Sequence, residues 1–359
     1  MSTFATTLEG PPIFVNGRFL TQPMTGVQRV AREVTAALRM RYGSRLSILG
    51  PARGMSSDAM NAMRVGRNTG QFWEQIDLPR HARSGVLLNL GNTAPLFHRR
   101  QLLMIHDAGI FSTPEAYSTK FRAWYRILQG ALGRGGTKII TVSEFSKNEL
   151  VRSLKLQAEH VHVVRPGVDH MVRLHADKEI LTRYGLRPGG FVLAVGTLAV
   201  HKNLAALNVL AEALAARGMP FAITGAVGGA AFSAKGPARL PAPALYLGRV
   251  TDPELKALYE NAACFIMPSL YEGFGLPAVE AMMCGCPVIA GDIPALRETC
   301  GSAALFCNPH APEEIAQVTL ALLDDAALRV QIREAALRYS AKMTWQKSAD
   351  ALVDIIARL

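Results

Sequence analysis

The sequence predicts an α/β protein with parallel sheets, divided into two domains. Short apolar runs alternate with amphipathic stretches along both halves of the 359-residue chain, which is the rhythm of strand–helix–strand units. The apolar runs are nearly continuous, as in strands that are covered on both faces. A chain of this length also suffices for two ordinary domains, each with its own core.

The first half supplies the strands of one domain. A strand at residues 13–15 precedes an amphipathic helix at residues 26–40. The remaining strands of this half are expected at residues 46–49, 86–88, 102–105 and 139–142. Ser143 is expected to cap the helix that follows the last of these strands. Near the end of this half, residues 163–169 are expected to form a strand that runs into a turn, where we expect Gly167 to supply an unusual backbone angle.

The second half repeats the pattern. Its strands are expected at residues 191–195, 221–223, 245–247, 263–267 and 288–290, and the chain then continues through helices to its end. A helix is expected from His201 to near Gly218. We place the domain boundary in the polar stretch that begins near Asp169, so that the domains span residues 1–172 and 173–343. Residues 344–359 form a final amphipathic helix.

The most informative stretch is Pro268–Pro287, which reads PSLYEGFGLPAVEAMMCGCP and follows an apolar strand. It places Gly273-Phe274-Gly275 before a short apolar helix that we expect to start at Pro277. A strand, a glycine loop and a helix N-terminus in series form an anion-binding cradle at the carboxyl end of a parallel sheet. Glu272 and Glu280 frame this cradle. They can accept protons from sugar hydroxyls, or they can be a solvated acidic pair beside a structural turn.

The nine residues from Glu272 to Glu280 resemble the E-x7-E signature of family-4 retaining glycosyltransferases. These enzymes have the GT-B fold, in which two Rossmann-like domains face each other across a cleft. The resemblance implies a donor-binding second domain and an acceptor-binding first domain, with the last helix packed back on the first. Glu280 would hold the ribose hydroxyls of a sugar nucleotide, and Glu272 would hold the hexose. The adjoining donor-binding residues would be Gly273, Phe274, Gly275 and Leu276.

Two further positions match catalytic residues of this family. Ile105-His106-Asp107 follows a strand and resembles the histidine–aspartate motif of the cleft wall, so His106 would touch the transferred sugar; a structural histidine is the alternative. Lys202 matches one of the two basic residues that stabilise charge on the departing diphosphate. Thr197 stands where many members have arginine. The Gly-Thr start followed by Lys-Asn resembles mannosyltransferase-like members and favours GDP-mannose as the donor.

The remaining residues expected to contact the sugar nucleotide lie outside these motifs. Gly26 precedes a helix, where its amide could meet a phosphate or an acceptor, although family members often carry a glycine pair there. Arg249 and Val250 follow a strand at a turn that borders the nucleotide base in this family. The sequence has no D-x-D metal motif. We therefore expect no metal and no cofactor, with Lys202 and a helix dipole acting on the diphosphate instead.

Charge is unevenly distributed along the chain. The net charge is +11, and residues 1–173 carry 23 Lys and Arg against 11 Asp and Glu, a net charge of +12. This excess indicates an anionic partner for the first domain. Nucleic-acid motifs are missing, so an anionic membrane surface is the preferred partner; an arginine-rich exposed surface without a partner is the alternative.

Other features of the sequence bear on the compartment. The five cysteines are odd in number and lack C-x-x-C spacing, which argues against zinc and against a disulfide framework. The first ten residues do not resemble a signal peptide, and no apolar stretch approaches the length of a spanning helix. We expect a cytoplasmic protein that contacts the inner face of the cell membrane.

The resulting hypothesis is a retaining, metal-independent hexosyltransferase that acts on a glycan or lipid-linked saccharide in bacterial polysaccharide or lipopolysaccharide assembly. A non-hydrolysing nucleotide-sugar epimerase of the same fold is one alternative, and a non-catalytic nucleotide-sugar binding protein is another. A nicotinamide dehydrogenase is disfavoured because no G-x-G-x-x-G opens the first helix.

Overall fold

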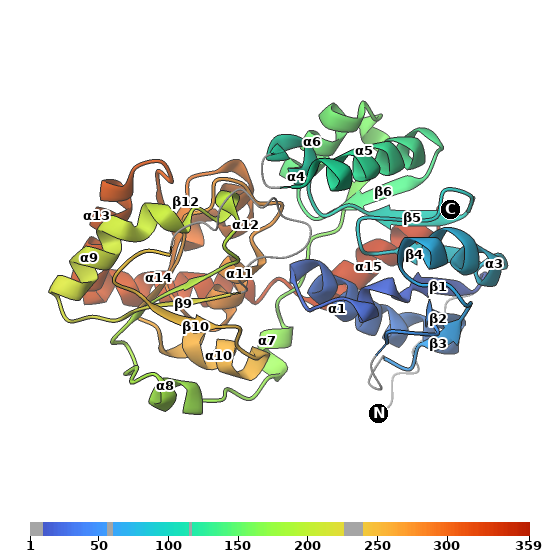
Figure 1. The fold of residues 1–359 in the computed structure, drawn as a ribbon. Helices are drawn as coiled ribbons and strands as arrows, with labels where there is room; N and C mark the ends of the chain where they lie inside the picture. Colours follow the sequence, from blue (N-terminus) through green and yellow to red (C-terminus); the bar gives the residue numbers. More distant parts are fainter. Residues whose placement is uncertain (1–9, 56–59, 115–116, 226–239) are drawn as a thin grey trace. The chain divides into compact units, whose positions relative to one another are not determined.

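Two parallel sheets organise the chain (Figure 1). The computed structural model describes residues 10–55, 60–114, 117–225 and 240–359. Unit 1 comprises Met1–Ala108, Ala123–Gly167 and Thr344–Leu359, and unit 2 comprises Gly109–Arg122 and Val168–Met343. The sequence analysis sets the first division slightly later, at residue 172, and does not expect the segment after Ala108 to group with unit 2.

The described residues of unit 1 form a seven-stranded sheet in which all neighbouring strands are parallel. In spatial order the strands are β3 (Met63–Val65), β2 (Leu46–Pro51), β1 (Ile13–Asn16), β4 (Val86–Asn89), β5 (Gln101–Met104), β6 (Lys138–Thr141) and β7 (Val161–Val163). Ile13 of β1 pairs with Leu46 on one side and with Val86 on the other. The chain therefore adds β2 and β3 on one side of β1 and then adds β4 to β7 on the other side.

Helices cover both faces of this sheet. The helical segments are η1 (Gly17–Thr21), α1 (Gly26–Tyr42), η2 (Gly43–Arg45), α2 (Gly70–Phe72), the π-helix η3 (Trp73–Asp77), α3 (Leu78–His81), α5 (Thr119–Arg134, which begins in unit 2), α6 (Glu144–Leu154), η5 (Ala158–His160) and α15 (Trp345–Ile356). Val15 and Leu88 pack in the cluster that contains residues of α1 and α15. Leu87 points to the other face and packs with Trp73 and Leu78. This alternation follows from the two-residue period of a strand.

The C-terminal helix α15 packs against α1, as Figure 1 shows. Gly167 permits this arrangement because a Cβ atom there would lie 2.2 Å from the Trp345 backbone nitrogen. Gly167 has no positive φ, so the prediction of an unusual backbone angle is wrong and close backbone approach is the reason for the glycine. The Ser348 hydroxyl also donates to the Arg165 carbonyl at 2.6 Å.

The described residues of unit 2 form a six-stranded parallel sheet. In spatial order the strands are β10 (Leu245–Gly248), β9 (Phe221–Thr224), β8 (Val192–Val195), β11 (Cys264–Met267), β12 (Val288–Gly291) and β13 (Leu305–Cys307). The direction of winding reverses between β8 and β11, as it does between β1 and β4 in unit 1. In open α/β sheets, ligands bind outside the carboxyl ends of the strands at this reversal.

The helical segments of unit 2 are α4 (Gly109–Ser112), α7 (His170–Arg173), α8 (Glu179–Arg183), η6 (Val200–Lys202), η7 (Leu204–Leu207), α9 (Asn208–Ala216), α10 (Asp252–Asn261), α11 (Leu276–Met283), α12 (Pro294–Cys300), η8 (Gly301–Ala303), α13 (Pro312–Asp324) and α14 (Ala326–Ser340). Helices α9 and α13 pack on each other and on β8, β9 and β11. Helix α14 packs on α11.

Most expected strands and the first helix are confirmed. Ser143 caps α6 by accepting a hydrogen bond from the Ser146 amide at 3.0 Å. The helix expected from His201 to Gly218 is wrong in its first half, because two 3₁₀ turns precede α9. The short edge strands β3 and β13 are missing from the sequence analysis. Within the described residues, no helix combines the length and the apolar character that crossing a bilayer requires.

Candidate functional site

The winding reversal of unit 2 brings together two charged residues from different loops. Lys202 lies in η6 after β8, and Glu272 lies in the loop after β11. The Lys202 Nζ atom is 2.6 Å from Glu272 Oε1, and the two side chains are 19% and 10% exposed. A charge-assisted hydrogen bond of this length, partly removed from solvent, pairs the two side chains at the position where a sheet of this type binds its ligand.

Asn203 connects the loops around this pair by hydrogen bonds. Its backbone has a φ of 55°, in the left-handed region that asparagine tolerates better than most residues. Its side-chain amide donates to the Pro268 carbonyl at 3.0 Å and to the Pro309 carbonyl at 2.6 Å. The Leu270 amide donates to the His201 carbonyl at 2.8 Å. These hydrogen bonds therefore connect the loops after β8, β11 and β13 to one another. The sequence analysis does not select Asn203 as a site residue, although its place directly after Lys202 was a usable signal.

The glycine loop leads into α11, as the sequence predicts, one residue earlier than expected. Gly275 precedes the helix with a φ of 86°, and a Cβ atom there would lie 2.3 Å from Leu296 Cδ2. Both the backbone conformation and the close contact therefore require glycine. The helix begins at Leu276 with Pro277 second. Pro277 has no N–H, and the Ala278 amide donates to the Gly275 carbonyl at 3.0 Å, so Leu276 is the first-turn residue whose amide has no intrahelical acceptor. Phe274 and Leu276 are buried, whereas Gly273 is partly exposed.

Glu280 lies in α11 and is 7% exposed. Its Oε1 atom is 3.1 Å from Nε2 of His170, a residue of α7 that is 3% exposed. A buried carboxylate needs such a partner because desolvation of a charge is costly. The sequence analysis does not identify His170, which lies 110 residues away along the chain, and no local pattern marks it.

The other expected donor residues of unit 2 also lie at the carboxyl edge of its sheet. Thr197 follows β8 closely and is partly exposed. Arg249 and Val250 follow β10, which is separated from β8 by β9. Arg249 is exposed. These residues therefore occupy the same edge as Lys202, but they do not all follow the strands that flank the winding reversal.

Unit 1 holds the remaining two predicted residues. His106 follows β5 and is 7% exposed, and its Nε2 atom lies 3.0 Å from the Leu90 carbonyl. Because a carbonyl only accepts, the neutral ring carries its proton on Nε2 and leaves Nδ1 as an acceptor. Burial lowers the pKa of His106, opposed by the Leu90 carbonyl and the Asp107 charge. Gly26 is the exposed first residue of α1.

Two protein-family models match the chain. The model for glycosyl transferases group 1 matches residues 189–339, and the model for glycosyltransferase family 4 matches residues 56–171.

Curated relatives agree with these matches. The O-antigen chain mannosyltransferase B of Escherichia coli is 30% identical over 258 residues, which cover 69% of this chain and 67% of that protein. The serotype-specific mannosyltransferase WbdA of Escherichia coli is 38% identical over 115 residues, but this chain spans only 14% of that protein's length.

Solved structures are similar over nearly the whole chain. Sucrose-phosphate synthase from Thermosynechococcus elongatus has a TM-score of 0.73 at 16% identity, covering 97% of this chain and 98% of that one. WaaG, a glycosyltransferase involved in lipopolysaccharide biosynthesis, has a TM-score of 0.69 at 16% identity, covering 96% and 99%.

Two Rossmann-like units, together with these matches, define a glycosyltransferase of the GT-B fold. The chain belongs to glycosyltransferase family 4, and its similarity to O-antigen mannosyltransferases places it in the mannosyltransferase-like part of that family.

Proposed function

We propose that this enzyme transfers a mannosyl residue from GDP-mannose to a saccharide acceptor, with retention of the anomeric configuration, during assembly of a bacterial polysaccharide or lipopolysaccharide. The names of the curated relatives support mannose and an O-antigen product. The Gly196-Thr197 start followed by Lys202-Asn203 supports the same donor. The observation that carries the proposal is the Lys202–Glu272 pair, fastened at the winding reversal of unit 2 beside the start of α11.

In this proposal unit 2 binds the donor. Glu280 accepts hydrogen bonds from the ribose hydroxyls while His170 holds its carboxylate in place. Glu272 and the backbone of Gly273–Gly275 hold the hexose. Thr197 lies beside the donor, and Arg249 and Val250 border the base. Phe274 and Leu276 supply the buried support under the glycine loop.

The reaction breaks the bond between the anomeric carbon and the diphosphate and forms a bond from that carbon to an acceptor hydroxyl oxygen, whose proton passes to the departing diphosphate. Negative charge grows on the departing diphosphate. Lys202 and the positive end of the α11 dipole offset this charge, so that no metal ion is required. The acceptor hydroxyl attacks from the face that the diphosphate leaves. His106 contacts the transferred hexose, for which its Nδ1 atom is a hydrogen-bond acceptor, and Gly26 offers its amide to a phosphate or the acceptor.

Thermal-shift measurements against UDP-, GDP-, dTDP- and ADP-sugars test the donor. GDP-mannose should stabilise the protein most, and stabilisation by another sugar nucleotide alone would contradict the assignment. The anomeric configuration of the product, read from its one-bond C–H coupling by NMR, tests retention; a β-linked mannoside would show inversion. Transfer should continue in excess chelator, and its complete loss would show that a metal is needed.

We also propose that unit 1 contacts an anionic membrane surface that carries a lipid-linked acceptor. The net charge of +12 over residues 1–173 supports this contact. Sedimentation with phosphatidylglycerol vesicles should exceed sedimentation with phosphatidylcholine vesicles, and the difference should disappear in high salt. Equal sedimentation would remove the proposal.

A further inference from the structure

The winding reversal of unit 1 also carries a charged pair, which the sequence analysis does not identify. It lies between β1 and β4, at their carboxyl ends, where sheets of this type bind ligands. Asn16 ends β1 and Asn89 ends β4, and both are buried. Arg18 follows in η1, Gln71 and Glu74 come from α2 and η3, and Thr93 lies in the loop after β4. We call these six residues the Arg18–Glu74 cluster.

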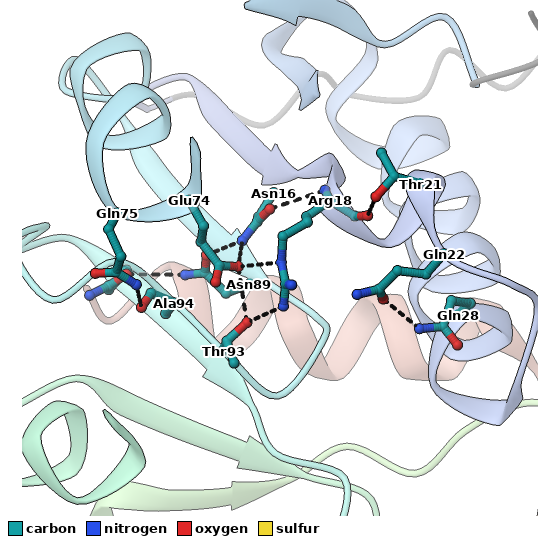
Figure 2. A network of polar contacts seen from close by, with 11 residues as sticks. Asn16, Arg18, Thr21, Gln22, Gln28, Glu74, Gln75, Asn89, Thr93 and Ala94 are labelled. Carbon is teal, nitrogen blue, oxygen red and sulfur yellow. Dashed lines mark hydrogen bonds and ion pairs between the residues drawn. The ribbon is translucent and has the colours of Figure 1, made fainter. Parts of the chain in front are cut away.

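Figure 2 shows how the side chains of Asn16, Arg18 and Thr93 converge on Glu74. Glu74 Oε1 accepts from Asn16 Nδ2 at 2.6 Å, from Arg18 Nε at 3.2 Å and from Thr93 Oγ1 at 3.0 Å. The Glu74 side chain is 1% exposed. It is held by a π-helix, a rare element that occurs frequently at functional sites.

Arg18 uses its guanidinium within the same cluster. Its second terminal nitrogen donates to Thr93 Oγ1 at 2.6 Å. When the Gln71 amide is assigned the orientation that satisfies both neighbours, its nitrogen lies 3.0 Å from Glu74 Oε2 and its oxygen lies 3.3 Å from the other terminal nitrogen of Arg18. The Tyr125 hydroxyl also faces this pair: burial raises its pKa, and the charge of and hydrogen bond to Arg18 oppose the rise.

An apolar set of side chains would fill this position at lower cost than a buried ion pair does. Desolvation of the two charges offsets most of their attraction, and apolar replacements are often as stable or more stable. Buried amides extend the network away from the pair. Asn16 Nδ2 donates to Asn89 Oδ1 at 3.0 Å, and Asn89 Nδ2 donates to Gln101 Oε1 at 3.1 Å. Such a costly, connected polar network at a ligand-binding edge indicates binding.

The charges within the cluster define which ligand suits it. The positive charge of Arg18 is matched by Glu74 at hydrogen-bond distance, and the other members are neutral amides and a hydroxyl. An anion would have to displace both Glu74 and Thr93 from Arg18 and would face the Glu74 carboxylate, which is 1% exposed. Lys202 of unit 2 has one such partner among the described residues, Glu272. A sugar hydroxyl both donates and accepts, so it matches a surface where amide, guanidinium and carboxylate groups alternate. Arg18, with 11% of its side chain exposed, and the partly exposed Gln71 are the members that a ligand can reach.

We propose that the Arg18–Glu74 cluster binds the acceptor and that this acceptor is an uncharged saccharide at the point of contact. The inference rests on the proposed transferase function, because it names the acceptor class for the same reaction. It separates this enzyme from relatives named for a phosphorylated acceptor, such as the D-inositol 3-phosphate glycosyltransferase of Arthrobacter, which is 30% identical over 60% of this chain.

The experiment compares the wild type with Arg18→Gln, Gln71→Ala and the control Arg41→Gln. Arg41 is a fitting control because it also pairs with a carboxylate in unit 1, that of Asp350 on α15, but both side chains are more than 40% exposed. Initial rates from GDP-mannose are measured with methyl α-mannoside, mannobiose and mannose 6-phosphate as acceptors. Saturation-transfer NMR measures binding of the same three saccharides without donor, and thermal melts monitor folding.

We expect transfer to the two uncharged saccharides and little to mannose 6-phosphate. Arg18→Gln and Gln71→Ala should each raise the acceptor KM at least tenfold, with an unchanged donor KM, and Arg41→Gln should change neither. Preference for mannose 6-phosphate, or an unchanged acceptor KM in folded Arg18→Gln and Gln71→Ala, would overturn the inference. If no sugar nucleotide is turned over, the proposed function fails. The acceptor site is still supported in that case if NMR shows that the wild type binds methyl α-mannoside and Arg18→Gln does not. Equal binding by the wild type and Arg18→Gln refutes the acceptor site.

Discussion

Replacement of Lys202 by methionine separates the electrostatic role of the ammonium group from its contribution to folding. The substitution keeps an unbranched side chain of similar length but removes the charge that lies 2.6 Å from Glu272 Oε1. Glu272 is then left without this partner while only 10% of its side chain is exposed. Two losses are expected from this change, one of stability and one of turnover.

The structure sets the size of each loss. A hydrogen bond between charged groups contributes about 1.5–3 kcal/mol, and the low exposure of Glu272 places the stability loss in the upper part of this range. If Lys202 also offsets charge on the departing diphosphate, kcat should fall by about 10²–10³, which corresponds to about 2.7–4 kcal/mol. The donor KM should change much less, because the charge develops only in the transition state.

A double-mutant cycle with Glu272→Gln decides between the two roles. The double variant should recover much of the stability measured by urea unfolding, since no unpaired carboxylate remains. Its kcat at saturating GDP-mannose should nevertheless lie about 10²–10³ below that of Glu272→Gln alone. Lys256→Met is the matched control, because Lys256 pairs with Glu260 at 2.9 Å on α10 of the same unit. Equal kcat values for the double variant and Glu272→Gln would refute the diphosphate role and leave Lys202 only as the partner of Glu272.

Other perturbations test further parts of the structure. Glu280→Gln should weaken donor binding by about 1.5–3 kcal/mol in calorimetry, because it removes the charge of a buried carboxylate held by His170 and replaces one acceptor oxygen by an amide donor; unchanged affinity would exclude Glu280 from the donor site. Gly167→Ala should lower the free energy of unfolding in urea by about 1–3 kcal/mol, since the new Cβ meets backbone atoms. The control Gly91→Ala has open space around it and should not lower it; similar losses in both variants would argue against the close approach. Burial raises the pKa of four thiols to about 12 and that of Cys286 well above its usual value, so N-ethylmaleimide at pH 7 should label the native protein slowly and the denatured protein fully; fast native labelling would show open thiols. The native pKa of His106 is lowered from 6.5, so as the pH falls the unfolded chain takes up this proton before the native protein does. The free energy of unfolding should therefore drop between pH 7 and 5, and the drop should be smaller in His106→Gln. Parallel plots of the free energy of unfolding against pH for the two proteins would contradict the lowered pKa.

Local patterns were sufficient to predict most of the strands and the glycine loop before α11. The strands of both units are buried on two faces and therefore have continuous apolar runs, which a sequence shows directly. Glycine and proline mark the start of α11 for steric reasons that hold in any context. The edge strand β3 is only three residues long and its Met63 and Arg64 are exposed, so no apolar run distinguishes it. The edge strand β13 lies in the apolar run 303–307, so the sequence did contain a signal for it that the prediction missed.

The polar partners of the site were beyond the reach of local patterns. His170 meets Glu280 across 110 residues, and Arg18 meets Glu74 across 56. Gly167 is a similar case, because the backbone it accommodates belongs to the last helix of the chain. Each of these positions is decided by which segments the fold brings together. Spacing along the chain therefore gives no indication of them.

The two units place a glutamate and a cation at the same topological position, but with different chemistry. In unit 2 the cation is Lys202, a compact charge with a mobile stem that can follow a phosphate as its charge changes. In unit 1 the cation is Arg18, whose fork is engaged by Glu74 and Thr93. A fork held in this way cannot follow a changing charge, but it can orient hydroxyl groups. Under the proposed function, unit 2 therefore stabilises the charge that develops on the diphosphate, and unit 1 selects and orients the attacking oxygen. This division explains why an acceptor with its own negative charge should be disfavoured at the Arg18–Glu74 cluster while a doubly charged diphosphate is accommodated beside Lys202.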